Sequence, residues 1–262
     1  MNLLRTLPLL LLTALAPSLR ASELPLRAGE QLIYRVSWAV FSGAGEIKID
    51  ATPAANPGQL SIVTTTVTRG VAKAFMYFKA DAESLFDLKT GKLLSMHENS
   101  TTRSKVAVHS TTFDYDKREA TYKKTTPAEQ PRVLPIPAGD PVDLIIALLQ
   151  TRSWNLKPGE KQDALVLFDD DFYELTIHAA RYEQITSKLG TFNTLVLEPR
   201  MDKTPPKGMF KRGSTVRVWI AQDERRLPVQ FQVEFKIGTG TARLESYRPP
   251  AAAAPDAKNP RP

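Results

Sequence analysis

Apolar and polar residues alternate along several segments of the chain, most regularly over residues 216–235. The apolar positions are Val216, Val218 and Ile220 and, after four consecutive charges, Leu227, Val229, Phe231, Val233 and Phe235. Period two is typical of a strand with one buried face, so the two arms predict a hairpin. The predicted facing pairs are Ile220 with Val229, Val218 with Phe231, and Val216 with Val233. The charges Asp223–Arg226 are interpreted as the solvated turn rather than a catalytic cluster, because an Asp side chain stabilises the first turn position.

A second alternating segment opens the fold after residue 28. Its apolar positions are Leu32, Tyr34, Val36, Trp38 and Val40, and they are followed by Ile47, Ile49 and Ala51. The glycine-containing stretch 42–45 between them predicts a loop, with Val40 facing Ile47 and Trp38 facing Ile49. Further β-branched and alternating stretches predict an antiparallel sheet of ten or more strands.

Two segments have helical spacing instead. Val71, Phe75 and Phe78 are four and three residues apart, which predicts a short amphipathic helix. Residues 140–152 predict a second helix, with Asp140 as its N-cap and Pro141 in its first position. Residues 144–149 are apolar on nearly every side, so this helix is expected to lie inside a curved sheet or beneath a lid.

These patterns predict a mainly β protein. The fold expected is an antiparallel curved sheet that forms a partial or closed β-barrel around one buried apolar helix. Residues 22–248 are assigned to this single domain, and the Pro- and Ala-rich segment 249–262 is predicted to be a disordered tail because it has little to bury.

The first 21 residues have the composition of a secretory signal peptide. Arg5 precedes the apolar run 6–16, and Ala21 offers a small residue at a cleavage point. The chain contains no cysteine, so no lipid-modified cysteine follows the signal. We expect an exported protein in a bacterial periplasm, with secretion as the alternative.

The charge balance is mildly basic. Lys and Arg number 35 against 28 Asp and Glu, a net charge of +7. This charge is consistent either with simple solubility or with attraction to anionic envelope surfaces. The basic residues are scattered and the chain is expected to be exported, so a nucleic-acid partner is not expected.

Few residues suggest chemistry. His97 and His109 lie symmetrically about Arg103 and would face each other across a three-residue turn, whereas His178 is expected to be exposed. The consecutive carboxylates at 169–171 lack the alternate spacing of a calcium loop and predict a solvated turn. We therefore expect no metal, no cofactor and no recognisable catalytic set.

One long loop has a candidate contact surface. Lys207, Lys211 and Arg212 surround the apolar pair Met209 and Phe210. Such a loop can contact a membrane interface or a partner, and it can equally be a hairpin connection whose Phe folds onto the core.

The order of several segments resembles that of a bacterial exported family, domain of unknown function 3108. The segments are GEQLIYRVSW with SGAGE, GDPVDLIIALLQTR, LGTFNTLVLEP and VRVWIAQDERRLPVQFQVEFKIGTGTARLES, within residues 28–247. The resemblance implies an antiparallel barrel or half-barrel of the cell envelope and assigns no catalytic residue. The architecture expected is also similar to that of periplasmic lipoprotein carriers, although fold analogy is weak evidence for function.

The function expected is a non-enzymatic envelope module that binds an amphipathic or apolar ligand, or an envelope partner, with at most peripheral membrane contact. The cavity candidates are Trp38, Phe75, Phe78, Leu144, Ile145, Leu148 and Trp219. Trp219 alternates away from Val218 and is expected to face solvent, a covering loop or a ligand. Two alternatives stay open. One is a cell-wall or polysaccharide hydrolase that uses carboxylates or the two histidines, and the other is an assembly factor that docks through a sheet edge.

Overall fold

A computed structural model describes residues 24, 26–206, 210, 213–235 and 238–250. The predicted signal peptide, residues 1–21, lies outside the described residues. So does the predicted tail, except for Pro249 and Pro250. Both assignments therefore stay predictions. In the described part of the chain, no helix is long and apolar enough to span a bilayer.

Fifteen strands form one sheet in the described residues, with the order β8-β7-β6-β5-β4-β3-β2-β1-β15-β14-β13-β12-β11-β10-β9. The N-terminal strands are β1 (Gln31–Trp38), β2 (Phe41–Pro53), β3 (Gln59–Thr68), β4 (Phe78–Asp87), β5 (Leu93–Thr102), β6 (Val106–Asp114), β7 (Glu119–Thr126) and β8 (Arg132–Pro135). The C-terminal strands are β9 (Pro141–Val142), β10 (Lys161–Phe168), β11 (Asp171–Ser187), β12 (Gly190–Arg200), β13 (Thr215–Ala221), β14 (Pro228–Phe235) and β15 (Gly238–Arg248). The prediction of a mainly β protein with a mostly antiparallel sheet is confirmed.

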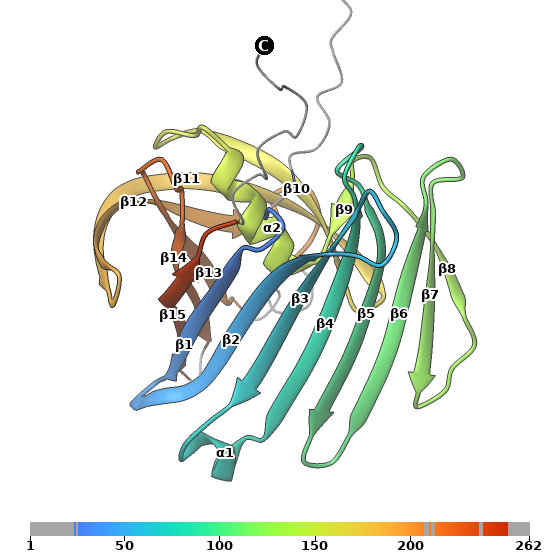
Figure 1. Ribbon diagram of the computed structural model, residues 1–262, viewed down its shortest axis with the longest axis horizontal. Coiled ribbons are helices and arrows are strands. Elements are labelled where there is room, and N and C mark those ends of the chain that lie inside the picture. The colour runs from blue at the N-terminus through green and yellow to red at the C-terminus, as the bar shows by residue number, and fades with distance from the viewer. Residues whose placement is uncertain (1–23, 25, 207–209, 211–212, 236–237, 251–262) are drawn as a thin grey trace, which may run out of the picture.

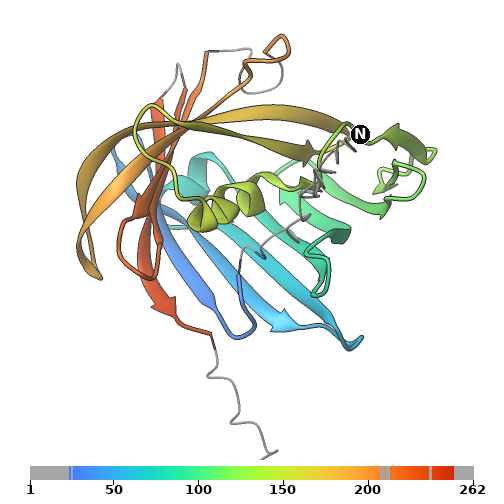
Figure 2. The same ribbon diagram turned by 90° about the horizontal axis from the view of Figure 1, so that it is seen from above.

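The topology consists of two meanders joined at their ends. Within each meander, neighbours in sequence are neighbours in the sheet, as short connections favour, whereas the consecutive strands β8 and β9 lie at opposite edges. Strands β1 and β15 pair antiparallel and unite the two meanders, whereas β9 and β10 form a parallel pair. Figures 1 and 2 show that the sheet curves strongly and that helix α2 (Leu144–Gln150) lies on its inner side.

The main hydrophobic core lies between α2 and the inner face of the sheet. Ile146 and Leu149 of α2 are fully buried and belong to the same cluster as Tyr34, Ile49 and many other strand residues. A 3-10 turn, η1 (Thr151–Ser153), ends the helical segment. Helix α2 therefore contributes to the core of the one sheet, in keeping with its apolar sequence.

The backbone ladder is not closed, because the edge strands β8 and β9 do not pair with each other. Side chains span this seam instead. The Tyr122 hydroxyl donates to Asp169 Oδ1 over 2.7 Å, and Arg132 forms an ion pair with Asp170. A second apolar cluster contains Ala120 on β7, Ile136 after β8 and Leu165 on β10. The sheet is thus an open one whose two edge regions are bridged by side chains.

The structure confirms part of the prediction that residues 169–171 form a solvated turn. Asp169 and Asp170 form the turn between β10 and β11, and Asp169 has a φ of 56°. The turn is not merely solvated, because both carboxylates bind residues across the seam.

The register of the first hairpin differs from the prediction. Tyr34 faces Ile47, and Trp38 faces Phe41 across a tight turn at Ala39 and Val40. The predicted loop lies instead inside β2, where a Cβ on Gly45 would come within 2.7 Å of the Val67 carbonyl oxygen of β3. The predicted loop glycine therefore permits close strand approach rather than a turn.

The second hairpin is largely as predicted. Val216 faces Val233 and Val218 faces Phe231, and the Asp223–Arg226 charges form the bend. A bulge after Trp219 places Ile220 opposite Pro228 instead of the expected Val229.

Both helices are shorter than predicted. The N-cap of α2 is Asp143, whose side chain accepts from the Ile146 N–H over 2.8 Å. Asp140 precedes β9, and Pro141 lies in that strand at the sheet edge, where its missing N–H is tolerated. Helix α1 (Ala72–Phe75) is a single turn, and Phe78 already begins β4, so the predicted helix is limited to the residues around Phe75.

Candidate functional site

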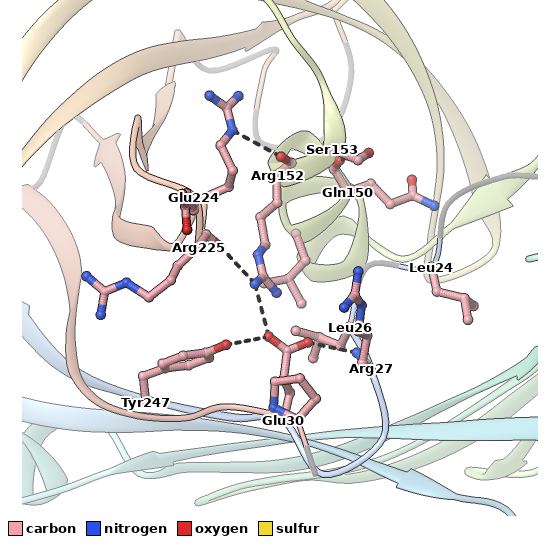
Figure 3. A pocket seen from close by; sticks show the side chains of 13 residues that line it. Leu24, Leu26, Arg27, Glu30, Gln150, Arg152, Ser153, Glu224, Arg225 and Tyr247 are labelled. Atoms are coloured by element: carbon pink, nitrogen blue, oxygen red, sulfur yellow. Dashed lines mark hydrogen bonds and ion pairs between the residues drawn. The ribbon is translucent and has the colours of Figure 1, made fainter. Parts of the chain in front are cut away.

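A pocket of about 340 Å³ opens at the end of the curved sheet where α2 stops (Figure 3). Four parts of the chain meet there: the segment before β1, the C-terminal end of α2 with η1, the bend between β13 and β14, and the end of β15. The lining residues are Leu24, Leu26, Arg27, Glu30, Leu149, Gln150, Arg152, Ser153, Glu224, Arg225, Arg226, Tyr247 and Pro250. The pocket therefore joins segments that are far apart in the sequence.

Glu30 is the buried acid of this pocket, with 3% of its surface exposed. Its Oε1 accepts from the Arg152 guanidinium over 3.0 Å and from the Tyr247 hydroxyl over 2.9 Å. Its Oε2 accepts from the backbone N–H of Arg27 over 2.7 Å. Both carboxylate oxygens are thus hydrogen-bonded, as a buried charge requires.

Arg152 connects Glu30 to the charged bend. Its guanidinium also donates to the Arg225 carbonyl oxygen over 3.1 Å. In return, Arg226 donates from Nε to the Arg152 carbonyl oxygen over 3.2 Å and from Nη2 to the Trp154 carbonyl oxygen over 2.6 Å. The bend therefore satisfies backbone carbonyls at the end of the helical segment, which otherwise lack partners. The bend, predicted only as a solvated turn, thus forms one side of the pocket, and Arg225 and Arg226 bind the helical segment there.

Burial alters the ionisation of three groups around the pocket. It is the largest cause of the raised pKa of Tyr34 and of Tyr247, and for Tyr247 the hydrogen bond to Glu30 adds to it. Burial lowers the pKa of Arg226 from its usual value, although a guanidinium remains charged at neutral pH. The tyrosines therefore act as neutral hydrogen-bond donors beside fixed positive charge.

One wall of the pocket is apolar and another carries cations. Leu26 and Leu149 are 1% and 0% exposed, and Leu24 lies partly buried beside them. Arg27 is exposed, and among the described residues its guanidinium has no ion-pair partner. Arg152 neutralises Glu30, and Arg225 pairs with Asp223. The other lining cations, Arg27 and Arg226, outnumber the other lining acid, Glu224, so the pocket has an excess of positive charge. An apolar wall next to a free guanidinium suits an amphipathic anion.

The seven residues predicted as cavity candidates lie elsewhere in the fold. Leu148 is 3% exposed inside the main core, and Leu144 and Ile145 pack half-buried against it. Phe78 is half-buried at the start of β4, whereas Phe75 is 73% exposed on α1. The described residues that line the Glu30 pocket include none of the seven.

The two tryptophans among these candidates pack against other parts of the fold. The Trp38 ring lies over Gly240, where a Cβ would come within 3.1 Å of Trp38 Cε3. Trp219 is 3% exposed, and its neighbours Val218 and Ile220, which point the other way, are fully buried. Both faces of β13 are therefore covered, and solvent is excluded as the surroundings of Trp219.

The predicted contact loop can be followed at one position only. Phe210 is partly buried and packs against the main core. Lys207, Met209, Lys211 and Arg212 lie outside the described residues, so their membrane or partner role stays a prediction.

The predicted pairing of His97 and His109 is wrong. His109 faces Glu98, and His97 faces Ser110, because the β5–β6 turn is centred between Arg103 and Ser104, with the Thr102 N–H donating to the Lys105 carbonyl oxygen. This one-residue difference puts the histidines on opposite faces. His178 lies 2.5 Å from Asp202 Oδ2. Within the described ranges, no three His, Asp or Glu side chains are placed to hold a metal ion.

Sequence reasoning did not single out Glu30, Arg152 or Tyr247. Each of these side chains is an ordinary polar residue beside a strand or helix end. A signal was nevertheless present, because three of the segments that carry the family resemblance contain Glu30, Arg152 and Arg226. These segments, distant in sequence, meet at the pocket.

A family model described as "Protein of unknown function (DUF3108)" matches residues 33–245. The chain belongs to this family. The match confirms the resemblance and spans most of the sheet. A search of curated proteins finds no match.

Solved structures show likeness of fold. A β-barrel-like protein of domain of unknown function DUF1849 from Brucella abortus is similar with a TM-score of 0.54 and 8% identity, over 85% of this chain and 98% of that one. A candidate lipoprotein from Parabacteroides distasonis is similar with a TM-score of 0.32 and 8% identity, over 86% of this chain and 97% of that one. A candidate exported protein with a YmcC-like fold from Bacteroides fragilis is similar with a TM-score of 0.33 and 10% identity, over 87% of this chain and 99% of that one. At such identities, only the first likeness bears on this chain, and it bears on the barrel-like fold alone.

Proposed function

We propose that this protein is a non-enzymatic binding module of the bacterial envelope, and that it holds an amphipathic, anionic ligand in the Glu30 pocket. In this proposal the anionic head lies against Arg27 and the Arg152 side of the pocket. The apolar part lies along Leu24, Leu26 and Leu149. Helix α2 lies on the inner side of the curved sheet and contributes Leu149 to the pocket lining.

The observation that carries the proposal is a contrast between two neighbouring charges. The buried acid Glu30 already has its partners, whereas the guanidinium of Arg27 has no ion-pair partner among the described residues. Glu30 is satisfied by Arg152, Tyr247 and the Arg27 N–H, so it does not compete for Arg27. The Arg27 guanidinium is left for a carboxylate or phosphate at the pocket mouth. Charge-assisted hydrogen bonds of this kind are strong, and the adjacent leucines favour an alkyl group.

An envelope location is part of the proposal. It is supported by the sequence of the first 21 residues, which has the charge and apolar run of a secretory signal. Cleavage after Ala21 would leave only two residues before Leu24 of the pocket wall. Binding experiments therefore need the mature chain that begins at Ser22.

The proposal can be tested in two steps. Mature protein purified from its native periplasm is extracted and examined by mass spectrometry, where a stoichiometric amphiphile is expected. Ligand-free protein is then titrated with lysophosphatidylglycerol, with lysophosphatidylcholine as the matched lipid of zwitterionic head. The anionic lipid is expected to bind more tightly, because only its head group carries a net negative charge.

Arg27→Ala is the informative variant because Glu30 accepts from the backbone of Arg27, which the substitution retains. The loss of one charge-assisted contact should weaken binding of lysophosphatidylglycerol roughly tenfold or more. Arg181→Ala is the control, since Arg181 is exposed and pairs with Glu183 on β11, and it should not change the affinity. Equal affinity in the Arg27 and Arg181 variants, or no binding of either lipid by wild type, contradicts the proposal.

A further inference from the structure

A second surface lies at the opposite end of the strands from the pocket. The β1–β2 turn and α1 lie there, at the lower end of the molecule in Figure 1, and five large apolar residues on or beside them are exposed. These side chains, called here the tip patch, are Val40, Phe41, Val71, Phe75 and Met76, exposed by 89%, 39%, 65%, 73% and 52%. Clustered exposed apolar side chains of this size generally indicate a contact surface.

The tip patch is preformed rather than a set of separate loose loops. The rings of Phe41 and Phe75 lie 6.0 Å apart between centroids. The Arg69 N–H donates to the Ala44 carbonyl oxygen over 2.8 Å, which fastens the end of β3 to β2. Arg103 of the β5–β6 turn donates to the Ala74 carbonyl oxygen of α1. Three connections are thereby tied together, so the apolar side chains are presented as one surface.

The rim of the tip patch is basic. Arg69, Lys73, Arg103 and Lys105 belong to the connections that surround it. Arg69 forms an ion pair with Glu46 over 2.8 Å. In the part of the chain that is described, Lys73, Arg103 and Lys105 have no ion pair with any carboxylate. The patch therefore combines exposed apolar side chains with uncompensated positive charge.

We propose that the tip patch docks on the surface of an anionic phospholipid bilayer. Aromatic and aliphatic side chains with a basic rim are the composition that inserts to the level of the head groups. Each basic residue near an anionic leaflet adds attraction. The chain from Ser22 onward, without Arg5 and Arg20, keeps 33 basic against 28 acidic residues, a net charge of +5. The charge complementarity favours lipid over an apolar protein partner, which would leave three cations without counter-charges.

This docking fixes an orientation. Strand β1 separates the two sites, because Glu30 precedes its first residue and Val40 follows its last. Its eight residues span roughly 26 Å at 3.3 Å per residue. The docked molecule thus holds the Glu30 pocket away from the bilayer, open to the aqueous side. The inference stands independently of what occupies that pocket.

Vesicle sedimentation tests the proposal with the mature full-length chain. Wild-type protein is mixed with vesicles of phosphatidylglycerol and phosphatidylcholine, and separately with vesicles of phosphatidylcholine alone. Binding is expected on the anionic vesicles, and raising the salt concentration should weaken it. Circular dichroism confirms that each variant is folded.

Phe75→Ser should lower the partition coefficient about tenfold, because the substitution removes a large apolar side chain from the interface. Phe168→Ser is the matched control, since Phe168 is 52% exposed at the β10–β11 turn, and it should bind like wild type. The double variant Lys73→Gln/Lys105→Gln should weaken binding at least fivefold on anionic vesicles only. The control is the double variant Lys157→Gln/Lys161→Gln, which has the same net charge and should bind anionic vesicles like wild type.

Three results would overturn the proposal. The first is a folded wild-type protein that fails to bind anionic vesicles at low salt. The second is equal binding by the Phe75 and Phe168 variants. The third is a concentration-dependent dimer that Phe75→Ser abolishes, with no vesicle binding, which would assign the tip patch to a second copy of the chain.

Discussion

Arg152 and Glu30, 122 positions apart in the chain, form a 3.0 Å ion pair in which the side chains are 15% and 3% exposed. The pair joins the end of the helical segment to the segment that precedes β1. It differs from the surface pairs of the sheet because its members are shielded from water. Breaking such a pair leaves one charge buried without a partner, which is far costlier than losing a surface pair.

Arg152→Met should lower the free energy of unfolding by about 3 kcal/mol, because it leaves the Glu30 carboxylate buried without its cation. The double variant with Glu30→Gln should be more stable than the sum of the two single effects, since it removes both charges together. Denaturant unfolding of the four proteins measures this coupling. Arg35→Met, which breaks an exposed pair with Glu245, is the control and should have a much smaller effect. Additive single effects would show that the pair is not coupled.

Arg226→Lys should also destabilise the protein. A lysine keeps the charge but cannot reach the carbonyl oxygens of Arg152 and Trp154 with the geometry of the guanidinium. The expected loss is about 1–2 kcal/mol, in thermal or denaturant unfolding. Arg225→Lys is the matched control, because the Arg225 side chain binds Asp223 at the exposed bend, and its effect should be near zero. Similar losses in both variants would mean that the contact of the bend with the helical segment contributes little.

The seam between the sheet edges should open more readily in Tyr122→Phe. This substitution removes the 2.7 Å hydrogen bond to Asp169 and keeps the ring. Faster amide hydrogen exchange is expected in β7, β8 and β10, with little change in the central pair β1 and β15. Tyr182→Phe, at an exposed position on β11, is the control. A uniform increase across the sheet would show that the seam does not open as a separate unit.

The pH dependence of stability should reveal the buried N-cap of α2. Burial raises the pKa of Asp143 above its usual value of 3.8. The folded state therefore binds this proton more tightly than the unfolded state, and its stabilising contribution is lost as the pH rises above 3.8 through the raised value. Asp143→Asn keeps the cap but has no proton to lose. The stability of this variant relative to wild type should thus increase from pH 4 to pH 7.

Asp87→Asn provides a control of opposite sign. The hydrogen bonds from the Thr90 side chain and backbone lower the pKa of Asp87, so wild type gains from this carboxylate as the pH rises. The variant should therefore lose stability relative to wild type as the pH rises from the lowered pKa of Asp87 through 3.8, and the difference should level off at higher pH. Thermal unfolding at several pH values compares the two. A relative stability of Asp143→Asn that does not change with pH would contradict the raised pKa.

Alternation predicted the faces of the strands better than their partners. In the first hairpin the predicted and observed pairings of Trp38 differ by an even number of residues, from Ile49 to Phe41. An even slip leaves every side chain on the same face, so the apolar pattern cannot distinguish the two registers. The observed register places Gly45 against β3, where a Cβ would come within 2.7 Å of the Val67 carbonyl oxygen, and this contact lies outside the first hairpin.

The histidine prediction was wrong for the opposite reason. His97 and His109 lie in a weakly alternating pair of strands, so nothing in the pattern excluded a one-residue change of turn length. That change moved the two imidazoles to opposite faces. The second hairpin, which alternates strictly, kept its predicted pairs Val216–Val233 and Val218–Phe231.

The sequence by itself determined the mainly β class, the bend at Asp223–Arg226 and the apolar character of α2, because these depend on local period and turn chemistry. Only the tertiary structure decided that Glu30, Arg152 and Tyr247 share one pocket, and that Phe41 and Phe75 share one exposed surface. Such contacts depend on strand order and on the curvature of the sheet. Curvature is the summed twist of many strands, and no single segment of the chain encodes it.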